Sequence, residues 1–204
     1  MTTLIVLTVL GYVLGSISFA VVVSRALHLP DPRTYGSHNP GATNVLRTGR
    51  KTAALLTVLG DAMKGWLAVY IAARYAETGM IDETMATAAV AVILGHMYPL
   101  FFRFQGGKGV ATALGMLAAL NLYLAAGSVA TWVIIAAFFR ISSLAALVAA
   151  VFAPFFALIL YNAAHPFFLA VTVSCALLVF RHRENIRNLL AGKEGRFGGG
   201  PAAN

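Results

Sequence analysis

Cysteine and acidic residues are scarce in this chain of 204 residues, and each scarcity excludes a class of protein. The one cysteine, Cys175, lies inside an apolar run, so neither a disulfide framework nor a thiolate metal site is available. Charged residues make up 11% of the chain and hydrophobic residues 59%, which excludes an ordinary soluble domain. The composition predicts an all-α, polytopic membrane protein. We expect a single integral-membrane domain over 1–204, with a disordered tail at 197–204.

The net charge of +8 would suit a nucleic-acid partner, but the positions of the basic residues argue against one. They fall in the gaps between apolar runs, where positive charge sets topology and contacts anionic lipid headgroups. Gap 25–52 and the C-terminal tail from residue 181 are rich in Lys and Arg, whereas gap 76–83 holds only acidic charges. The sequence therefore predicts membrane lipids as partners and no nucleic acid.

Six apolar runs predict the membrane-spanning helices. They cover residues 3–24, 53–75, 84–102, 110–139, 142–161 and 165–180. The run 110–139 is too long for one span of a hydrocarbon core about 30 Å thick, and Asn121 interrupts it near the middle. We therefore expect a tight hairpin of two short helices there, either spanning or re-entrant. This hairpin places every basic gap in the cytoplasm, which gives seven helices, N-terminus out and C-terminus in.

Three polar clusters interrupt the apolar pattern, and the predicted topology places all three on the cytoplasmic face. The first cluster, residues 35–47, holds Ser37, Asn39, Asn44 and Arg47. Its amides and small residues suit a sharp turn that donates hydrogen bonds, and a guanidinium matches phosphate bidentately. A polar loop without special chemistry is the alternative interpretation.

The second cluster is the break between two apolar segments. Its glycines let backbone N–H groups approach an anion, its lysine neutralises charge, and a following helix start favours negative charge. It is not a Walker A loop, because Phe102 and Gly109 stand where that motif needs glycine and Ser or Thr. A flexible turn with one snorkelling lysine is the alternative. The candidate residues are His96, Gly106, Gly107, Lys108, Gly109 and Thr112.

The third cluster covers residues 181–190. On a helix that leaves the membrane, His182 and Asn185 would share one face, although a basic tail also serves as a topology signal. Asp61 and Lys64 lie one helical turn apart inside an apolar run. Charges at that depth indicate either support of a functional site or an ion pair that holds the bundle together.

Together these clusters resemble the bacterial acyl-phosphate:glycerol-3-phosphate acyltransferases of the inner membrane, from the first helix to about residue 196. The resemblance rests on Gly36-Ser37-x-Asn39-x-Gly41-Ala42-Thr43-Asn44 with Arg47, on Gly95-His96-x-x-Pro99 with Gly106-Gly107-Lys108-Gly109, and on Arg181-His182-x-Glu184-Asn185-Ile186. His38 stands where the family commonly has glycine. The resemblance implies transfer of a fatty acyl group from acyl phosphate to glycerol 3-phosphate, giving lysophosphatidic acid and phosphate, the first step of phospholipid synthesis.

The resemblance also implies roles for individual residues. Glycerol 3-phosphate would contact Ser37, Arg47, Lys108, His182 and Asn185, with Asn39 and Asn44 beside them. The glycine turn 106–109 and Thr112 would hold the acyl phosphate. Residues with a catalytic role would be His182, His96, Lys108 and Asn185, with Asp61 and Lys64 as support.

An acyl phosphate carries its own good leaving group, so no covalent nucleophile, metal or cofactor is expected. The general base stays open among His182, His96, Asp61 and a phosphate oxygen of the substrate, and we favour the substrate with histidine support. The enzyme that makes acyl phosphate is a candidate partner. The alternative function is a small membrane transporter of an organic phosphate, which should instead show repeats and helices broken at the midplane.

Overall fold

The computed structural model describes residues 1–196, and every regular element in that part of the chain is helical. The predicted tail at 197–204 lies outside the described residues. The elements are α1 (Thr2–Gly15), α2 (Phe19–Ala26), α3 (Ala42–Leu46), α4 (Lys51–Tyr75), α5 (Ile81–Met97), the 3-10 helix η1 (Leu100–Phe102), α6 (Val110–Leu120), α7 (Leu122–Phe139), α8 (Ser142–Leu160), α9 (Pro166–Arg181) and α10 (Arg183–Leu190).

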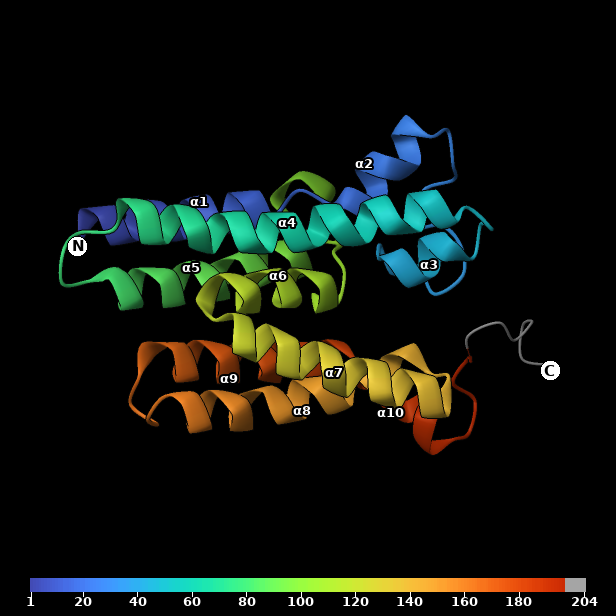
Figure 1. Ribbon diagram of the computed structural model, residues 1–204. Coiled ribbons are helices and arrows are strands. Elements are labelled where there is room, and N and C mark those ends of the chain that lie inside the picture. The colour runs from blue at the N-terminus through green and yellow to red at the C-terminus, as the bar shows by residue number, and fades with distance from the viewer. Residues whose placement is uncertain (197–204) are drawn as a thin grey trace.

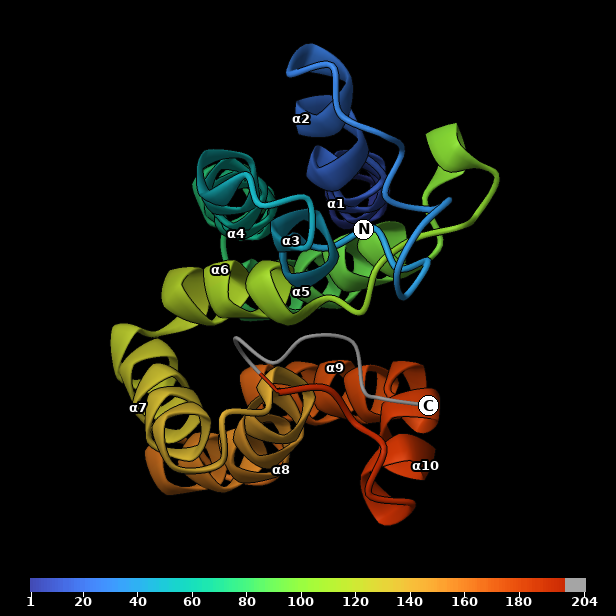
Figure 2. The same ribbon diagram turned by 90° about the vertical axis from the view of Figure 1, so that its right-hand side faces the viewer.

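The helices form two packed groups. One holds α1, α4, α5 and α6 with the short helices α2 and α3, and the other holds α7, α8 and α9 with α10 (Figures 1 and 2). Packing of α5 against α9 joins the two groups. Small residues allow close helix approach, as in other membrane bundles: a Cβ atom on Gly15 of α1 would collide with the Val92 carbonyl of α5.

The predicted set of spans agrees with the structure. Four segments are long and apolar enough to cross a membrane: α4, α5 with η1, α7 and α8. Each of two bent pairs, α1 with α2 and α9 with α10, adds one span when it is counted as a unit. These make up to six candidate spans, and α6, an apolar helix of 11 residues, is the seventh of the predicted helices.

The first run, predicted as one helix over 3–24, is broken. Helices α1 and α2 meet at 42°, with residues 16–18 between them. The Ser16 hydroxyl donates to the Tyr12 carbonyl at 2.9 Å, a bond that competes with regular helix geometry. The Ile17 carbonyl accepts a hydrogen bond from Lys64 Nζ at 2.5 Å. A distant side chain therefore satisfies the backbone that the break exposes, which a local hydrophobic pattern does not reveal.

The run 110–139 does form two helices that run in roughly opposite directions, α6 and α7 (Figures 1 and 2). Asn121 joins them, and its side-chain oxygen accepts from the Tyr123 backbone N–H at 2.8 Å, capping α7. The expectation of two short helices is half wrong. Helix α6 has 11 residues, but α7 has 18 and is long enough to span.

The third polar cluster was predicted to lie on one helix that leaves the membrane. The structure instead breaks the helix there. Helix α9 ends at Arg181, and α10 follows at an angle of 58°. His182 lies at the corner, and its Nδ1 donates to the Leu178 carbonyl in the last turn of α9 at 2.8 Å. The imidazole thus adds a second hydrogen bond to a carbonyl that already accepts from the His182 backbone N–H at 3.1 Å.

Candidate active site

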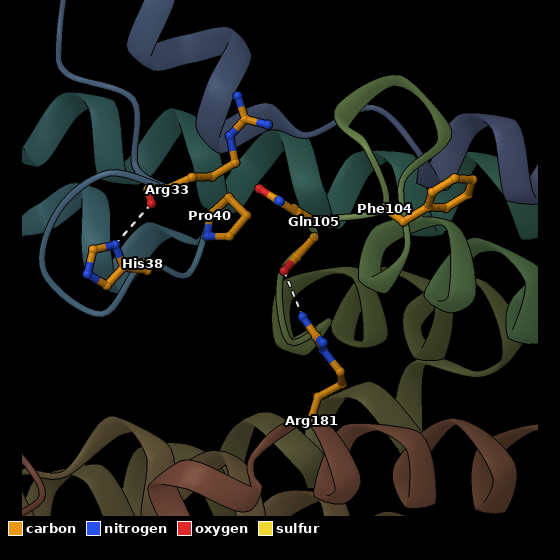
Figure 3. A pocket seen from close by; sticks show the side chains of 7 residues that line it. Arg33, His38, Pro40, Phe104, Gln105 and Arg181 are labelled. Atoms are coloured by element: carbon orange, nitrogen blue, oxygen red, sulfur yellow. Dashed lines mark hydrogen bonds between the residues drawn. The ribbon is translucent and has the colours of Figure 1, made fainter.

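The three polar clusters meet around the loop formed by residues 103–109, which we call the glycine loop. Arg181 donates to the Gly106 carbonyl at 2.8 Å and to the Gly107 carbonyl at 3.3 Å, which joins the third cluster to the second (Figure 3). On the other side of the loop, a Cβ atom on Gly107 would lie 3.0 Å from the Pro40 carbonyl of the first cluster. Segments that lie more than 140 residues apart in sequence, from Pro40 to Arg181, therefore line one site.

The glycine loop is held from below by α5 and opens into α6. The Gly107 N–H donates to the His96 carbonyl at 3.1 Å, and His96 Nε2 lies directly against the Gly107 α-carbon. Gly109 has φ of +89° and precedes Val110, the first residue of α6. The left-handed conformation at Gly109 suits glycine and agrees with the predicted helix start after the glycine–lysine turn.

Lys108 projects from the glycine loop toward α10. Its Nζ donates to Asn185 Oδ1 at 2.5 Å. Burial lowers the pKa of Lys108, and the nearby carboxylates of Glu194 and Glu184 oppose that shift. The guanidinium of Arg47 also lowers the pKa, which shows that the first cluster contributes positive charge to the same place.

The first cluster folds around the amide of Asn44, which is buried in the short helix α3. Its Nδ2 donates to the Pro32 and Tyr35 carbonyls at 2.7 and 3.1 Å, and its Oδ1 accepts from the Ser37 N–H at 3.1 Å. Asn44 was predicted to contact substrate, but its amide is used within the loop.

This folding leaves other polar groups of the first cluster at the surface. Ser37 and Arg47 are exposed, and Asn39 is partly buried. The turn requires Gly36, whose φ is +60° and where a Cβ atom would approach Nη1 of Arg47 to 3.2 Å. The loop therefore presents the Ser37 hydroxyl and the Arg47 guanidinium at its surface.

His182 is almost fully buried at the corner beyond the spanning helix α9, with 2% of its surface exposed. Because its Nδ1 donates to the Leu178 carbonyl, a neutral ring keeps Nε2 as an acceptor.

A buried polar network lies beneath the glycine loop. Lys64 Nζ lies 2.9 Å from Asp61 Oδ1, and His96 Nδ1 lies 3.5 Å from the same oxygen. The Thr112 hydroxyl lies 3.1 Å from His96 Nδ1. The structure thus forms the ion pair that the sequence left as one alternative, and it joins that pair to His96, the residue under Gly107.

An open pocket of about 360 Å³ adjoins the glycine loop (Figure 3). Its lining consists of Arg33, His38, Pro40, Phe104, Gln105, Gly106 and Arg181. Its two arginine side chains already have hydrogen-bond partners within the protein. Arg33 binds Asp31 bidentately at 2.9 and 2.6 Å, and Arg181 holds the glycine-loop carbonyls.

Of these pocket residues, only Gly106 was predicted from the sequence as a site residue. Arg181 could have been found, since it lies in the third cluster, but nothing local indicates that its side chain would turn toward Gly106. Within residues 1–196, no three His, Cys, Asp or Glu side chains come together as metal ligands would.

The fold and the site define an integral-membrane protein of packed helices. Its lysine, arginine and glycine-rich turn come together at the end of the bundle where α3 and α10 lie, away from the N-terminus (Figure 1). The sequence model of the family described as glycerol-3-phosphate acyltransferase matches residues 5–192. The chain belongs to this family.

Individual relatives extend over nearly the whole chain. The glycerol-3-phosphate acyltransferase of Cupriavidus taiwanensis is 60% identical over 189 residues, which is 92% of this chain and 93% of the relative. That of Ralstonia pickettii is 60% identical over 195 residues, covering 95% and 94%.

Two crystal structures of PlsY (YgiH), an integral membrane glycerol 3-phosphate acyltransferase, have the same fold. The glycerol 3-phosphate form matches with a TM-score of 0.88 at 39% identity, covering 96% of both chains. The lysophosphatidic acid form matches with a TM-score of 0.85 at 39% identity, covering 96% of this chain and 95% of that one.

Proposed function

We propose that this protein transfers a fatty acyl group from an acyl phosphate to the sn-1 hydroxyl of glycerol 3-phosphate. The products are lysophosphatidic acid and inorganic phosphate, and the reaction is the first step of phospholipid synthesis. The protein acts as one integral-membrane domain in the bacterial inner membrane, with its site on the cytoplasmic face. The observation that carries the proposal is the meeting of the three polar clusters at Gly106, Gly107 and Lys108.

The charges of the site fit two phosphorylated substrates. Among residues 1–196, Lys108 Nζ donates only to Asn185, so two of its three N–H donors remain for a phosphate. Arg47, exposed beside the loop, supplies a guanidinium fork. We assign both to the phosphate of glycerol 3-phosphate, together with Ser37, His182 and Asn185.

The glycine loop serves the acyl phosphate. Its glycines let the donor approach the backbone closely, and α6 begins directly after the loop, so its dipole favours the phosphate. We assign the donor phosphate to Gly106, Gly107 and Gly109. Thr112 is buried and contacts His96, so its contribution is to support the loop from below.

The chemistry needs no enzyme nucleophile. The substrate hydroxyl attacks the acyl carbon, the bond from that carbon to the phosphate oxygen breaks, and the hydroxyl proton moves to phosphate. Backbone N–H groups stabilise the developing oxyanion. A phosphate oxygen accepts the proton, and His182, whose Nδ1 is held by the Leu178 carbonyl, supports the hydroxyl through Nε2. His96 acts through the loop that it supports.

Purified protein in detergent tests the proposal when it is given palmitoyl phosphate and glycerol 3-phosphate. We expect release of phosphate in equal amount to lysophosphatidic acid, and much slower reaction with an acyl thioester. Lys108→Ala should remove turnover, whereas Lys51→Ala, an exposed lysine at the start of α4, serves as the matched control. Substrate uptake into vesicles without phosphate release would identify a transporter and refute the proposal.

The topology has its own test in intact cells. A cysteine introduced at Ser37 should react with a membrane-impermeant thiol reagent only after the cells are opened. A cysteine at Glu77, which lies 3.0 Å from the N-terminal amine at the opposite end of the bundle, should react from outside. Labelling of the Ser37 position from outside would contradict a cytoplasmic site.

A further inference from the structure

The C-terminal segment turns one carboxylate inward. Glu194 is partly buried, whereas its neighbours Lys193 and Gly195 are exposed. One oxygen, Oε1, accepts hydrogen bonds from Ser143 Oγ at 2.6 Å and from Asn185 Nδ2 at 2.5 Å. The residues matched by the family model end at 192, two positions before Glu194, whereas its partners Ser143 and Asn185 lie within the matched range.

Glu194 sets which way the Asn185 amide faces. An amide has one donor end and one acceptor end, whereas an ammonium only donates and a carboxylate only accepts. Lys108 donates to Asn185 Oδ1, and Glu194 accepts from Asn185 Nδ2. With these two groups at opposite ends, the reversed amide would bring N–H against ammonium and oxygen against carboxylate. Only one orientation is therefore favourable.

Helix α8 anchors the carboxylate. Ser143 is the second residue of α8, so its hydroxyl holds Glu194 where backbone N–H groups and the helix dipole favour a negative charge. The chain of contacts runs from α8 through Glu194 and Asn185 to Lys108 of the glycine loop. It connects the two helix groups at the site.

We propose that Glu194 is a positioning residue of the anion site: by fixing the Asn185 amide, it holds the Lys108 ammonium ready for the phosphate of glycerol 3-phosphate. The role rests on the proposed function for its substrate. Glu194 touches neither reacting atom and acts through Asn185.

The charges that face Lys108 predict a second effect of Glu194. Glu194 and Glu184 raise the pKa of Lys108, whereas burial, Arg181 and Arg47 lower it. Removing Glu194 takes away one of the two opposing carboxylates. Lys108 should then lose its proton at a lower pH.

Two variants separate the positioning effect from the charge effect. Glu194→Ala removes both the hydrogen bonds and the charge, whereas Glu194→Gln keeps an acceptor oxygen and removes only the charge. Lys193→Ala, at the neighbouring exposed position, controls for disturbance of the tail. Ser143→Ala keeps the carboxylate and removes its anchor, so it still tests the role if the Glu194 variants fold poorly.

The first measurement uses no substrate. The rate of Lys108 acetylation by acetic anhydride, followed by mass spectrometry over a pH series, reports when the ammonium loses its proton. We expect its midpoint to move to lower pH in both Glu194 variants and to stay in place in Lys193→Ala. An unmoved midpoint in Glu194→Ala would overturn the proposal, whether or not the wild type is an acyltransferase.

The second measurement is steady-state kinetics with palmitoyl phosphate and glycerol 3-phosphate. Glu194→Ala should raise KM for glycerol 3-phosphate by about tenfold, the loss typical of one charge-assisted hydrogen bond that positions a binding group. Ser143→Ala should raise KM by a smaller factor, and kcat should change less than KM in both. A lower KM in Glu194→Ala would show that the carboxylate competes with substrate, which contradicts a positioning role. If the wild-type protein forms no lysophosphatidic acid, the proposed function is wrong, and the positioning role of Glu194 is still tested by the acetylation measurement.

Discussion

Gly107→Ala tests whether the glycine loop must lie where the structure places it. The added Cβ atom would collide with Nε2 of the buried His96 and would come within 3.0 Å of the Pro40 carbonyl. Neither neighbour can move away freely. The Pro40 atom is a backbone carbonyl oxygen, and the His96 side chain contacts Thr112 and lies within 3.5 Å of Asp61 Oδ1.

The size of the effect follows from where the strain is relieved. Overpacking by one methyl group in a tightly packed interior costs about 1–3 kcal/mol. The least expensive relief is a shift of the loop, since the loop borders an open pocket at Gly106. A displacement of about 1 Å at a positioning group lowers catalytic rates on the order of 100-fold. We therefore expect a modest loss of stability and a large loss of activity.

Purified Gly107→Ala should be compared with wild type in thermal unfolding and in kcat/KM for acyl phosphate. Gly195→Ala is the matched control, because a Cβ atom there meets nothing within 4 Å. The reasoning is refuted if Gly107→Ala keeps wild-type kcat/KM, or if its activity falls only in proportion to the fraction that remains folded.

Three further predictions concern charge and loop support. Because burial lowers the pKa of Lys108, kcat/KM for glycerol 3-phosphate should decline on the alkaline side at a lower pH than an exposed lysine would produce, and Lys108→Arg should remove that decline from the pH profile. Asp61→Asn leaves the buried Lys64 ammonium without its carboxylate and should cost about 3–5 kcal/mol in unfolding measurements. Asp61→Leu with Lys64→Met should recover part of that loss, because the Ile17 carbonyl still loses its donor; equal stability of the single and double variants would contradict this. Asn44→Ala removes the three hydrogen bonds that fold the first loop, so KM for glycerol 3-phosphate should rise with little change in the melting temperature; a collapse of the melting temperature would show that the amide supports the whole bundle.

The spans were predictable because each must bury a long apolar stretch and satisfy its own backbone. The breaks between helices were harder to predict than the spans. Asn121 indicated the turn between α6 and α7. An amide inside an apolar run can form hydrogen bonds at a helix end, where backbone N–H groups are free. The bend at residues 16–18 gave no comparable signal, because its carbonyl partner is Lys64, a residue 47 positions further along the chain.

The site followed the same rule. Glycines around Lys108 indicated a phosphate-binding turn because only glycine leaves the backbone so open. The sequence could not indicate that the Asn44 amide would form its hydrogen bonds within its own loop, or that Glu194 would contact Asn185. Both depend on directions of side chains that become close only when the helices pack.

The amino-acid order alone determined that this chain crosses a membrane several times and carries three polar clusters suited to phosphate. Hydrophobicity and local turn chemistry act over a few residues, so they can be read directly from neighbours. Which clusters touch, which charges are buried and which amide faces which ion were decided only by tertiary packing. Those contacts join groups far apart in the sequence, such as Lys108 and Asn185, which are 77 positions apart. No local pattern shows that such groups lie close together.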